Sequence, residues 1–243
     1  MLIVLVAVGV CVGGLAACRP AGTDDVIRGD YREPAGIAAA AVTAYGNEQA
    51  MDAYEELTDY LERDAYAAEL INPPARRPDA DELTGPLADR LTPDGRAGWD
   101  ALVGQALAGD GEAEESVRLL RYYDWTIGDP DRVSPPGPPE GHVFRDAEVD
   151  LGAADSTGAR PLSVSLRQST RFALRSARSP YPVLIEKDLT VLMYPASLFT
   201  TRSPSASAVP SVGGRPDWLI DSFEGELTVT TPDTGRQPTP RGE

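Results

Sequence analysis

The first half of the chain carries its apolar residues at helical spacing. After Gly46, one stripe advances in steps of three and four residues, with acidic side chains on the opposite face: Met51, Tyr54, Thr58, Leu61, Ala65 and Ala68. This spacing predicts an amphipathic helix that ends at Asn72-Pro73-Pro74. Similar patterns predict further helices from Pro34, near residues 87–91, after Thr92-Pro93 and over residues 112–120.

After about residue 121 the period of the pattern changes from 3.6 residues to two, which is typical of strands. In the clearest strand, one set of side chains shares the inward face: Leu162, Val164, Leu166, Thr170, Phe172 and Leu174. Shorter alternations predict strands over residues 123–127, 143–151, 183–194 and 218–229, the last with a bulge at Gly225. Over residues 143–151 the alternation places Val143 with Ala147, and Phe144 on the opposite face.

Helices that precede a run of strands predict the α+β class, with N-terminal helices packed on one face of a curved, mainly antiparallel sheet of about five strands. A strand over residues 162–175 would exceed about 40 Å, so a twisted sheet should bend it. The order of the elements and this long bent strand resemble the cone-shaped domains of the nuclear transport factor 2-like family, over roughly residues 34–230. A helical subdomain beside a β-sandwich is the alternative.

Residues 1–18 carry no charged side chain and end in Leu15-Ala16-Ala17-Cys18. This ending resembles a bacterial lipoprotein signal, which implies that Cys18 becomes the acylated first residue and anchors the chain to a membrane. No Lys or Arg precedes the apolar run, and Cys11 is a weaker candidate because bulky Val10 precedes it. An uncleaved transmembrane anchor is the alternative, although about 20 residues are usually needed to span a bilayer.

The expected organisation has four parts: a signal peptide over residues 1–17, a flexible tether over 18–33, a single α+β domain over 34–230 and a disordered tail over 231–243. The net charge of −16 lies entirely after the signal and argues against a nucleic-acid partner, which requires basic patches. Both cysteines lie within residues 1–18, so the domain has no disulfide and no thiol ligand. No Gly-rich phosphate loop or Ca²⁺ loop occurs in the sequence, so no cofactor and no metal is predicted.

The sequence contains one histidine and one lysine, and both are predicted to have structural roles. His142, which any Ser-His-Asp or Cys-His site would have to use, follows a proline-rich segment and is expected at the exposed end of a loop. Lys187 lies between Glu186 and Asp188 and is expected to be a paired surface charge. Two rows on neighbouring strands predict cross-strand ion pairs: Arg167, Arg171 and Arg175 against Asp146, Glu148 and Asp150.

Asp124 and Asp221 lie among aromatic residues on predicted strands. Inside a closed cone, burial would raise the pKa of either carboxyl and make it a candidate general acid or base. The alternation favours an outward polar position for both, so no catalytic residue is assigned.

Residues 195–216 join two strands through a long segment of Ser, Pro, Ala and Gly, a length typical of lids and binding loops. With the aromatic residues of the predicted strands, this segment suggests a ligand- or partner-binding site made of Tyr123, Trp125, Phe172, Leu198 and Phe199. We therefore expect a non-catalytic, lipid-anchored accessory module outside the cytoplasm that binds an envelope protein or a small apolar ligand. A small-molecule enzyme of the cone-shaped type and a structural subunit of an envelope complex are the alternatives.

Overall fold

A block of helices followed by a block of long strands makes up the computed structural model, which describes residues 30–66, 70, 78–123, 139–175, 180–199 and 216–230. The helical elements are α1 (Ala39–Tyr45), α2 (Asn47–Arg63), α4 (Ala80–Thr84), the 3₁₀ turn η2 (Gly85–Leu87), α5 (Pro93–Leu107) and α6 (Gly111–Leu120). The strands are β1 (Tyr31–Arg32), β2 (Gly36–Ile37), β3 (Gly141–Leu151), β4 (Leu162–Arg175), β5 (Pro180–Pro195) and β6 (Trp218–Thr230), with the 3₁₀ turn η3 (Ala196–Leu198) after β5. The predicted α+β class is confirmed.

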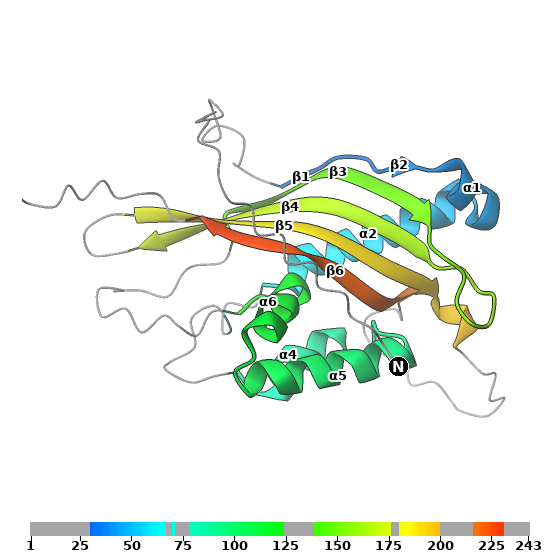
Figure 1. Cartoon of the computed structure of the whole chain (residues 1–243). Helices are drawn as coiled ribbons and strands as arrows, with labels where there is room; N and C mark the ends of the chain where they lie inside the picture. The colour runs from blue at the N-terminus through cyan, green and yellow to red at the C-terminus, as the bar shows by residue number, and fades with distance from the viewer. Residues whose placement is uncertain are drawn as a thin grey trace, which may run out of the picture.

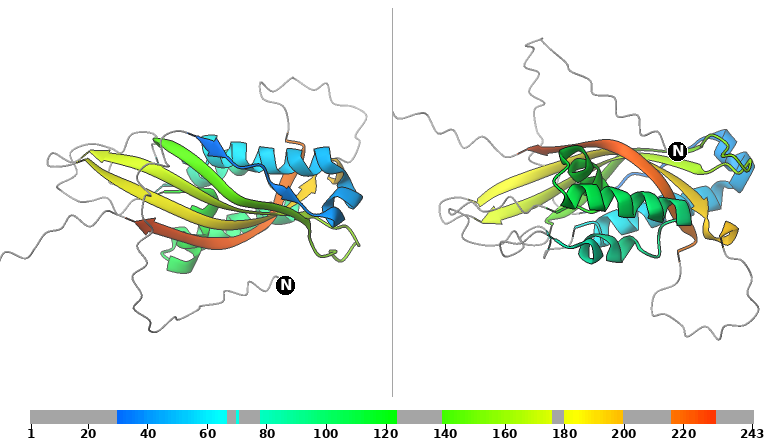
Figure 2. Two further views of the ribbon diagram at one scale, coloured as in Figure 1. Left: turned by 90° about the horizontal axis from the view of Figure 1, so that it is seen from above. Right: turned by 60° about the horizontal axis from the view of Figure 1, so that its bottom comes forward.

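The strands form one open sheet in the order β1-β3-β4-β5-β6, and β2 also pairs with β3. Strands β3 to β6 are antiparallel neighbours, whereas the two-residue strands β1 and β2 lie parallel to β3. The long strands twist and curve, and α2, α4, α5 and α6 all lie on one side of them (Figures 1 and 2). This arrangement confirms N-terminal helices on one face of a curved, mainly antiparallel sheet.

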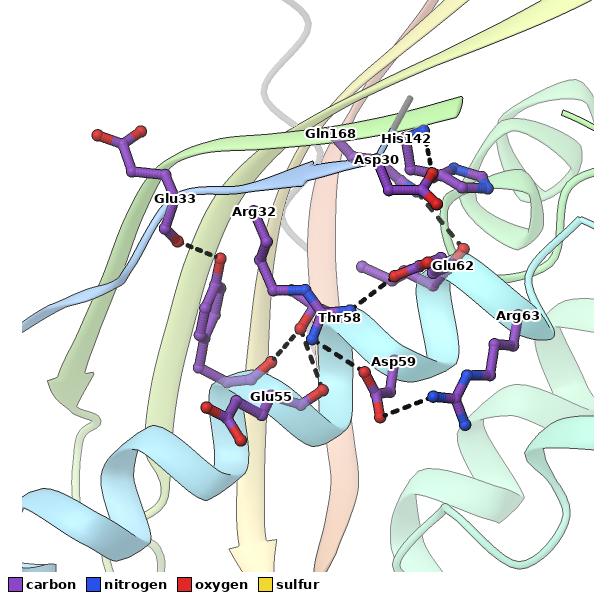
Figure 3. Close-up of polar contacts among 12 residues, drawn as sticks. Asp30, Arg32, Glu33, Glu55, Thr58, Asp59, Glu62, Arg63, His142 and Gln168 are labelled. Atoms are coloured by element: carbon purple, nitrogen blue, oxygen red, sulfur yellow. Dashed lines mark hydrogen bonds and ion pairs between the residues drawn. The ribbon is translucent and has the colours of Figure 1, made fainter. Parts of the chain in front are cut away.

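Residues 30–33 belong to the fold, although the sequence predicts a tether up to residue 33. Strand β1 pairs with β3, and the Arg32 guanidinium lies 2.9 Å from Asp59 and 2.7 Å from Glu62 on α2 (Figure 3). Helix α2 begins after Gly46 as predicted but ends at Arg63, short of the predicted end at Asn72.

A bulge in β3 changes which side chains face the helices. The register with β4 shifts between Arg145 and Glu148, and Asp146 takes a φ of 52°, in the left-handed region that few non-glycine residues adopt. Phe144 before the bulge and Ala147 after it therefore both belong to the core. The prediction that Phe144 faces outward is wrong, because the extra residue shifts the alternation by one position.

The alternation in β4 is confirmed, since the inward residues with described side chains are buried: Leu162, Val164, Leu166, Thr170 and Phe172. On the opposite face, Arg167 lies 3.4 Å from Asp146 and 2.7 Å from Asp188. Arg171 instead pairs with Glu140 at 3.2 Å, and the side chain of Arg175 lies outside the description. The expected pairing of the two rows is thus confirmed for Arg167 with Asp146.

Strand β6 forms one edge of the sheet. Its Ile220 N–H donates to Arg90 O at 2.7 Å, and Thr92 N–H donates to Ile220 O at 2.9 Å, so the turn before α5 covers this edge. Further along, residues 224–226 and 228–230 are exposed. The register with β5 slips around Asp221, whereas Gly225 pairs in register, so the prediction of a bulge at Gly225 is wrong.

Candidate functional site

Five polar side chains lie buried between the sheet and the ends of the helices: Tyr66, His142, Gln168, Thr170 and Lys187. We refer to them as the inner polar cluster. None exposes more than 5% of its surface, and Gln168, Thr170 and Lys187 expose none. The sequence predicts an exposed His142 and a surface Lys187, and both predictions are wrong.

The register of the sheet brings the cluster together. Gln168 of β4 pairs with Lys187 of β5, and Thr170 of β4 pairs with His142 of β3. Residues directly opposite one another project from the same face of a sheet, and here this face is the one covered by helices. The alternation along β5 does indicate that Lys187 faces inward, because it lies two residues before the inward Leu189. The acidic neighbours of Lys187 obscure this indication in the sequence.

The Lys187 ammonium group binds the carboxyl-terminal end of α6. Its Nζ donates to Leu119 O at 2.8 Å and lies 4.4 Å from the centroid of the Tyr66 ring. A cation is favourable at both groups, because the last carbonyls of a helix lack intrahelical partners and the face of an aromatic ring is electronegative. Burial nevertheless lowers the pKa of Lys187 from 10.5 to about 7, since no described carboxylate offsets the loss of water around it.

His142 contacts neutral groups through its ring and a carboxylate through its backbone. Its Nδ1 lies 3.1 Å from Thr170 Oγ1 and 3.4 Å from Gln168 Nε2, and its backbone N–H donates to Asp30 at 3.1 Å (Figure 3). Burial lowers the pKa of His142, and the nearby charges of Asp30 and Glu62 oppose this effect only in part. The cluster therefore holds two basic side chains whose neutral forms are favoured by the same dry surroundings.

One buried oxygen atom of the cluster, Gln168 Oε1, has no hydrogen-bond partner in the described structure. The Gln168 amide uses its Nε2 instead, which lies 3.4 Å from Leu61 O in the last turn of α2. Burial raises the pKa of the Tyr66 hydroxyl, and the adjacent Thr170 hydroxyl moderates this shift. A buried polar atom without a partner costs about 1–3 kcal/mol, so the closed cluster leaves part of its own polar surface unsatisfied.

Two of the predicted binding residues, Phe172 and Tyr123, are buried, and Phe172 packs against the cluster. The Phe172 ring lies 5.5 Å from the Tyr66 ring, between centroids. Tyr123 follows α6 outside any strand and is 1% exposed, so the predicted strand does not begin there. Asp124 and Trp125, like Cys18 and the predicted tail, lie outside the described residues.

The other two predicted binding residues, Leu198 and Phe199, lie on the surface after β5. Leu198 exposes 58% and Phe199 39% of its surface. The turn is fixed, because Ala196 N–H donates to Asp217 O at 2.8 Å and the Phe199 ring packs edge-on against Tyr194. The structure does not bring this pair together with Phe172, since the two lie toward opposite ends of the β4–β5 ladder.

Asp221 has a structural partner. Its Oδ1 accepts a hydrogen bond from Thr92 Oγ1 at 2.7 Å, and the same Thr92 oxygen accepts the Gly95 N–H at 2.9 Å as the N-cap of α5. Asp221 is half-buried and orients the residue that starts this helix.

An open hollow of about 480 Å³ lies on the surface beside α2 and is lined mostly by carboxylates. Arg90 neutralises part of this charge, with Glu56 at 3.6 Å and Asp64 at 3.7 Å. Glu56 also accepts the N–H groups of Asp217 and Trp218, so Glu56 and Arg90 already serve the fold. Across the described ranges, no group of three or more His, Cys, Asp or Glu side chains is arranged to hold a metal ion.

Comparison with known proteins finds no match: no family model, no curated protein and no solved structure corresponds to this chain. The resemblance to nuclear transport factor 2-like domains stays a prediction. Within the part of the chain that the structure describes, no helix has the length and apolar character required to cross a membrane.

Proposed function

We propose that this chain is a lipid-anchored lipoprotein of the cell envelope whose α+β domain is a non-catalytic module that binds another envelope protein. The observation that carries the binding proposal is the exposed pair Leu198 and Phe199. Adjacent apolar side chains on a fixed turn suit a contact site, because a partner can bury them with little further ordering of the chain.

The sequence Leu15-Ala16-Ala17-Cys18 after an uncharged apolar run supports the anchor. Acyl chains on Cys18 would hold the domain at a membrane by burying hydrocarbon in the bilayer. The net charge of −16 disfavours close contact with anionic lipid, so an extended attachment suits this domain better than adsorption.

Two polar groups that a catalytic role would need already serve the fold, which supports a non-catalytic module. Asp221 accepts its hydrogen bond from Thr92 at the start of α5. Lys187 donates to Leu119 at the end of α6.

Mass spectrometry of the protein purified from native membranes tests the anchor. We expect an acylated Cys18 at the new amino terminus and no residues before it. Cys18→Ala should abolish acylation, whereas the matched variant Cys11→Ala should leave it unchanged. An unmodified residue 18 with the leader still attached would refute the proposed location.

Site-specific photocrosslinking in intact cells tests the binding surface. A photoreactive residue at Phe199 should form a defined adduct with one envelope protein, and Leu198→Ser should weaken it. The control position is Arg96, an exposed-face residue of α5 that pairs with Asp100 at 2.9 Å. Equal adducts from positions 96 and 199, or none from 199, would count against this surface.

A further inference from the structure

We propose that the carboxyl-terminal part of β6, residues 223–230, is a docking edge for an extended basic segment of a partner protein, which adds to the sheet as a further strand. The side chains of that strand would alternate between basic and apolar residues. The exposed pair Leu198 and Phe199 follows the end of β5 that pairs with Trp218, whereas residues 223–230 lie at the other end of this ladder. The two surfaces are therefore separate.

Strand β6 is the last strand on its side of the sheet and lies along one margin of it in both views of Figure 2. At its start, the main chain of Ile220 exchanges hydrogen bonds with Arg90 and Thr92 at 2.7 and 2.9 Å. Within the described ranges, residues 223–230 pair with β5 alone. Alternate N–H and C=O groups of an edge strand point away from the sheet, where an extended peptide can bond to them. Among the described segments, the turn before α5 thus covers the start of the edge and none covers the rest.

The face of β6 that points toward the helices is apolar and becomes more exposed along the strand. Phe223, Leu227 and Val229 share this inward face, since their partners on β5 are all buried. Phe223 and Leu227 pack against the core, whereas Val229 exposes 45% of its surface. An added strand would cover these residues with its own apolar side chains, and burial of apolar surface favours association.

The opposite face of the same edge carries negative charge. Glu224 and Glu226 are exposed, and Glu226 lies directly opposite Asp188 of β5. Like charges opposite one another on a sheet destabilise it. Arg167 lies 2.7 Å from Asp188, but no cation of the described chain pairs with Glu224 or Glu226. A basic side chain on an added strand would lie beside both carboxylates and relieve this repulsion.

The charge of the edge favours a basic partner over a second copy of this chain. Two copies paired edge to edge would bring Glu224 and Glu226 of one molecule close to those of the other, and the whole chain carries a net charge of −16. This repulsion weakens self-association, whereas the same carboxylates attract and orient a basic strand. The occupant that fits is an extended segment with Lys or Arg at every second position and Val, Ile or Leu between them.

A short synthetic peptide of alternating lysine and valine, added to the full chain in detergent, tests the docking edge. Binding is measured by fluorescence anisotropy at low salt. Amide hydrogen exchange should show added protection at alternate amides within residues 223–230 and no change at Ile220, whose N–H is already bonded. One edge of a strand contains alternate amides, so N-methylation of either the lysines or the valines should weaken binding at least about tenfold, and methylation of the other set should preserve it.

Two protein variants separate the edge from general charge attraction. Glu224→Gln combined with Glu226→Gln should weaken binding of the peptide about threefold to tenfold. The matched control combines Glu115→Gln with Glu148→Gln, which removes the same charge at exposed residues of α6 and β3 and should change binding less than about twofold.

Four results would overturn the proposal. The first is an equal loss of binding in the two double variants, and the second is equal binding of the parent peptide and both methylated peptides. The third is protection of every amide of residues 223–230 in the free chain, which would show that the edge is already paired. The fourth is a dimer of the free chain joined through these residues, which would assign the edge to a second copy.

Discussion

The Nζ of Lys187 lies 2.8 Å from the carbonyl oxygen of Leu119, so a strand of the sheet binds the carboxyl-terminal end of α6. A second buried basic side chain acts in the same way, since the Arg121 guanidinium donates to the carbonyl oxygens of Asp64 and Glu82. Neither α2 nor α6 has a glycine at its C-cap position. Buried basic side chains thus satisfy helix ends where a left-handed glycine often does so.

Lys187 should make the stability of the protein depend on pH. The pKa of its ammonium is about 7 in the folded chain and 10.5 when hydrated, so the unfolded state binds more protons between these values. The free energy of unfolding should rise with pH from 7 to 9, by roughly 1 kcal/mol per pH unit. Urea unfolding at pH 7, 8 and 9 measures this slope, and Lys187→Met should remove it. A Lys187→Met protein with the wild-type slope would assign the dependence to other groups.

Arg32 should stabilise the amino-terminal part of the fold more than its neighbour Arg63. Arg32 lies within 2.9 Å of both Asp59 and Glu62 and its side chain is 28% exposed, whereas Arg63 lies 3.6 Å from Asp59 and its side chain is 73% exposed. Arg32→Ala should cost about 1–2 kcal/mol in the free energy of unfolding, and Arg63→Ala less than about 0.5 kcal/mol. Equal losses in urea unfolding would contradict this difference.

The hydroxyl group of Thr92 should contribute to the stability of the protein. Thr92→Val removes both the cap of the Gly95 N–H and the bond to Asp221 while keeping the side-chain volume. We expect a loss of about 1–2 kcal/mol in stability, with most of it restored in Thr92→Ser. Thermal unfolding followed by circular dichroism measures both variants, and a stable Thr92→Val protein would exclude this role.

Two glycines should respond in opposite ways to a methyl group. A Cβ at Gly225 would clash with the backbone carbonyl of Asp188, whereas a Cβ at Gly98 on α5 meets no atom within 4 Å. Gly225→Ala should destabilise the protein by about 1–3 kcal/mol, because backbone on the neighbouring strand must move. Gly98→Ala should raise the stability by up to about 1 kcal/mol through helix propensity. Similar unfolding midpoints for the two variants would be inconsistent with this geometry.

The sequence predicts the class and layering of the fold because periodicity reports which face of each element is buried. The stripe over α2 and the alternation over β4 were sufficient for this. The phase of β3 was not predictable in the same way, since the bulge at Asp146 arises from pairing with β4. A one-residue shift there changes the face of the sheet on which Phe144 lies, and the local pattern of apolar residues does not indicate this shift.

The candidate site was missed for a different physical reason. A charged side chain favours the surface, so the sequence predicts an exposed Lys187 between two acidic residues, although its position in the alternation is inward. His142 and Gln168 join it only through the register of β3, β4 and β5. The carbonyl of Leu119, which makes the burial of a lysine tolerable, comes from a helix distant in sequence.

The uncovered end of β6 has a consequence for behaviour in concentrated solution. Main-chain groups along a free strand edge are a template for pairing with another molecule, and acidic side chains at such an edge oppose this. Glu224 and Glu226 lie in the exposed stretch after Ile220. The net negative charge that keeps the molecules apart vanishes near the isoelectric point of about 4.4, so acidification should convert a dispersed protein into strand-linked aggregates.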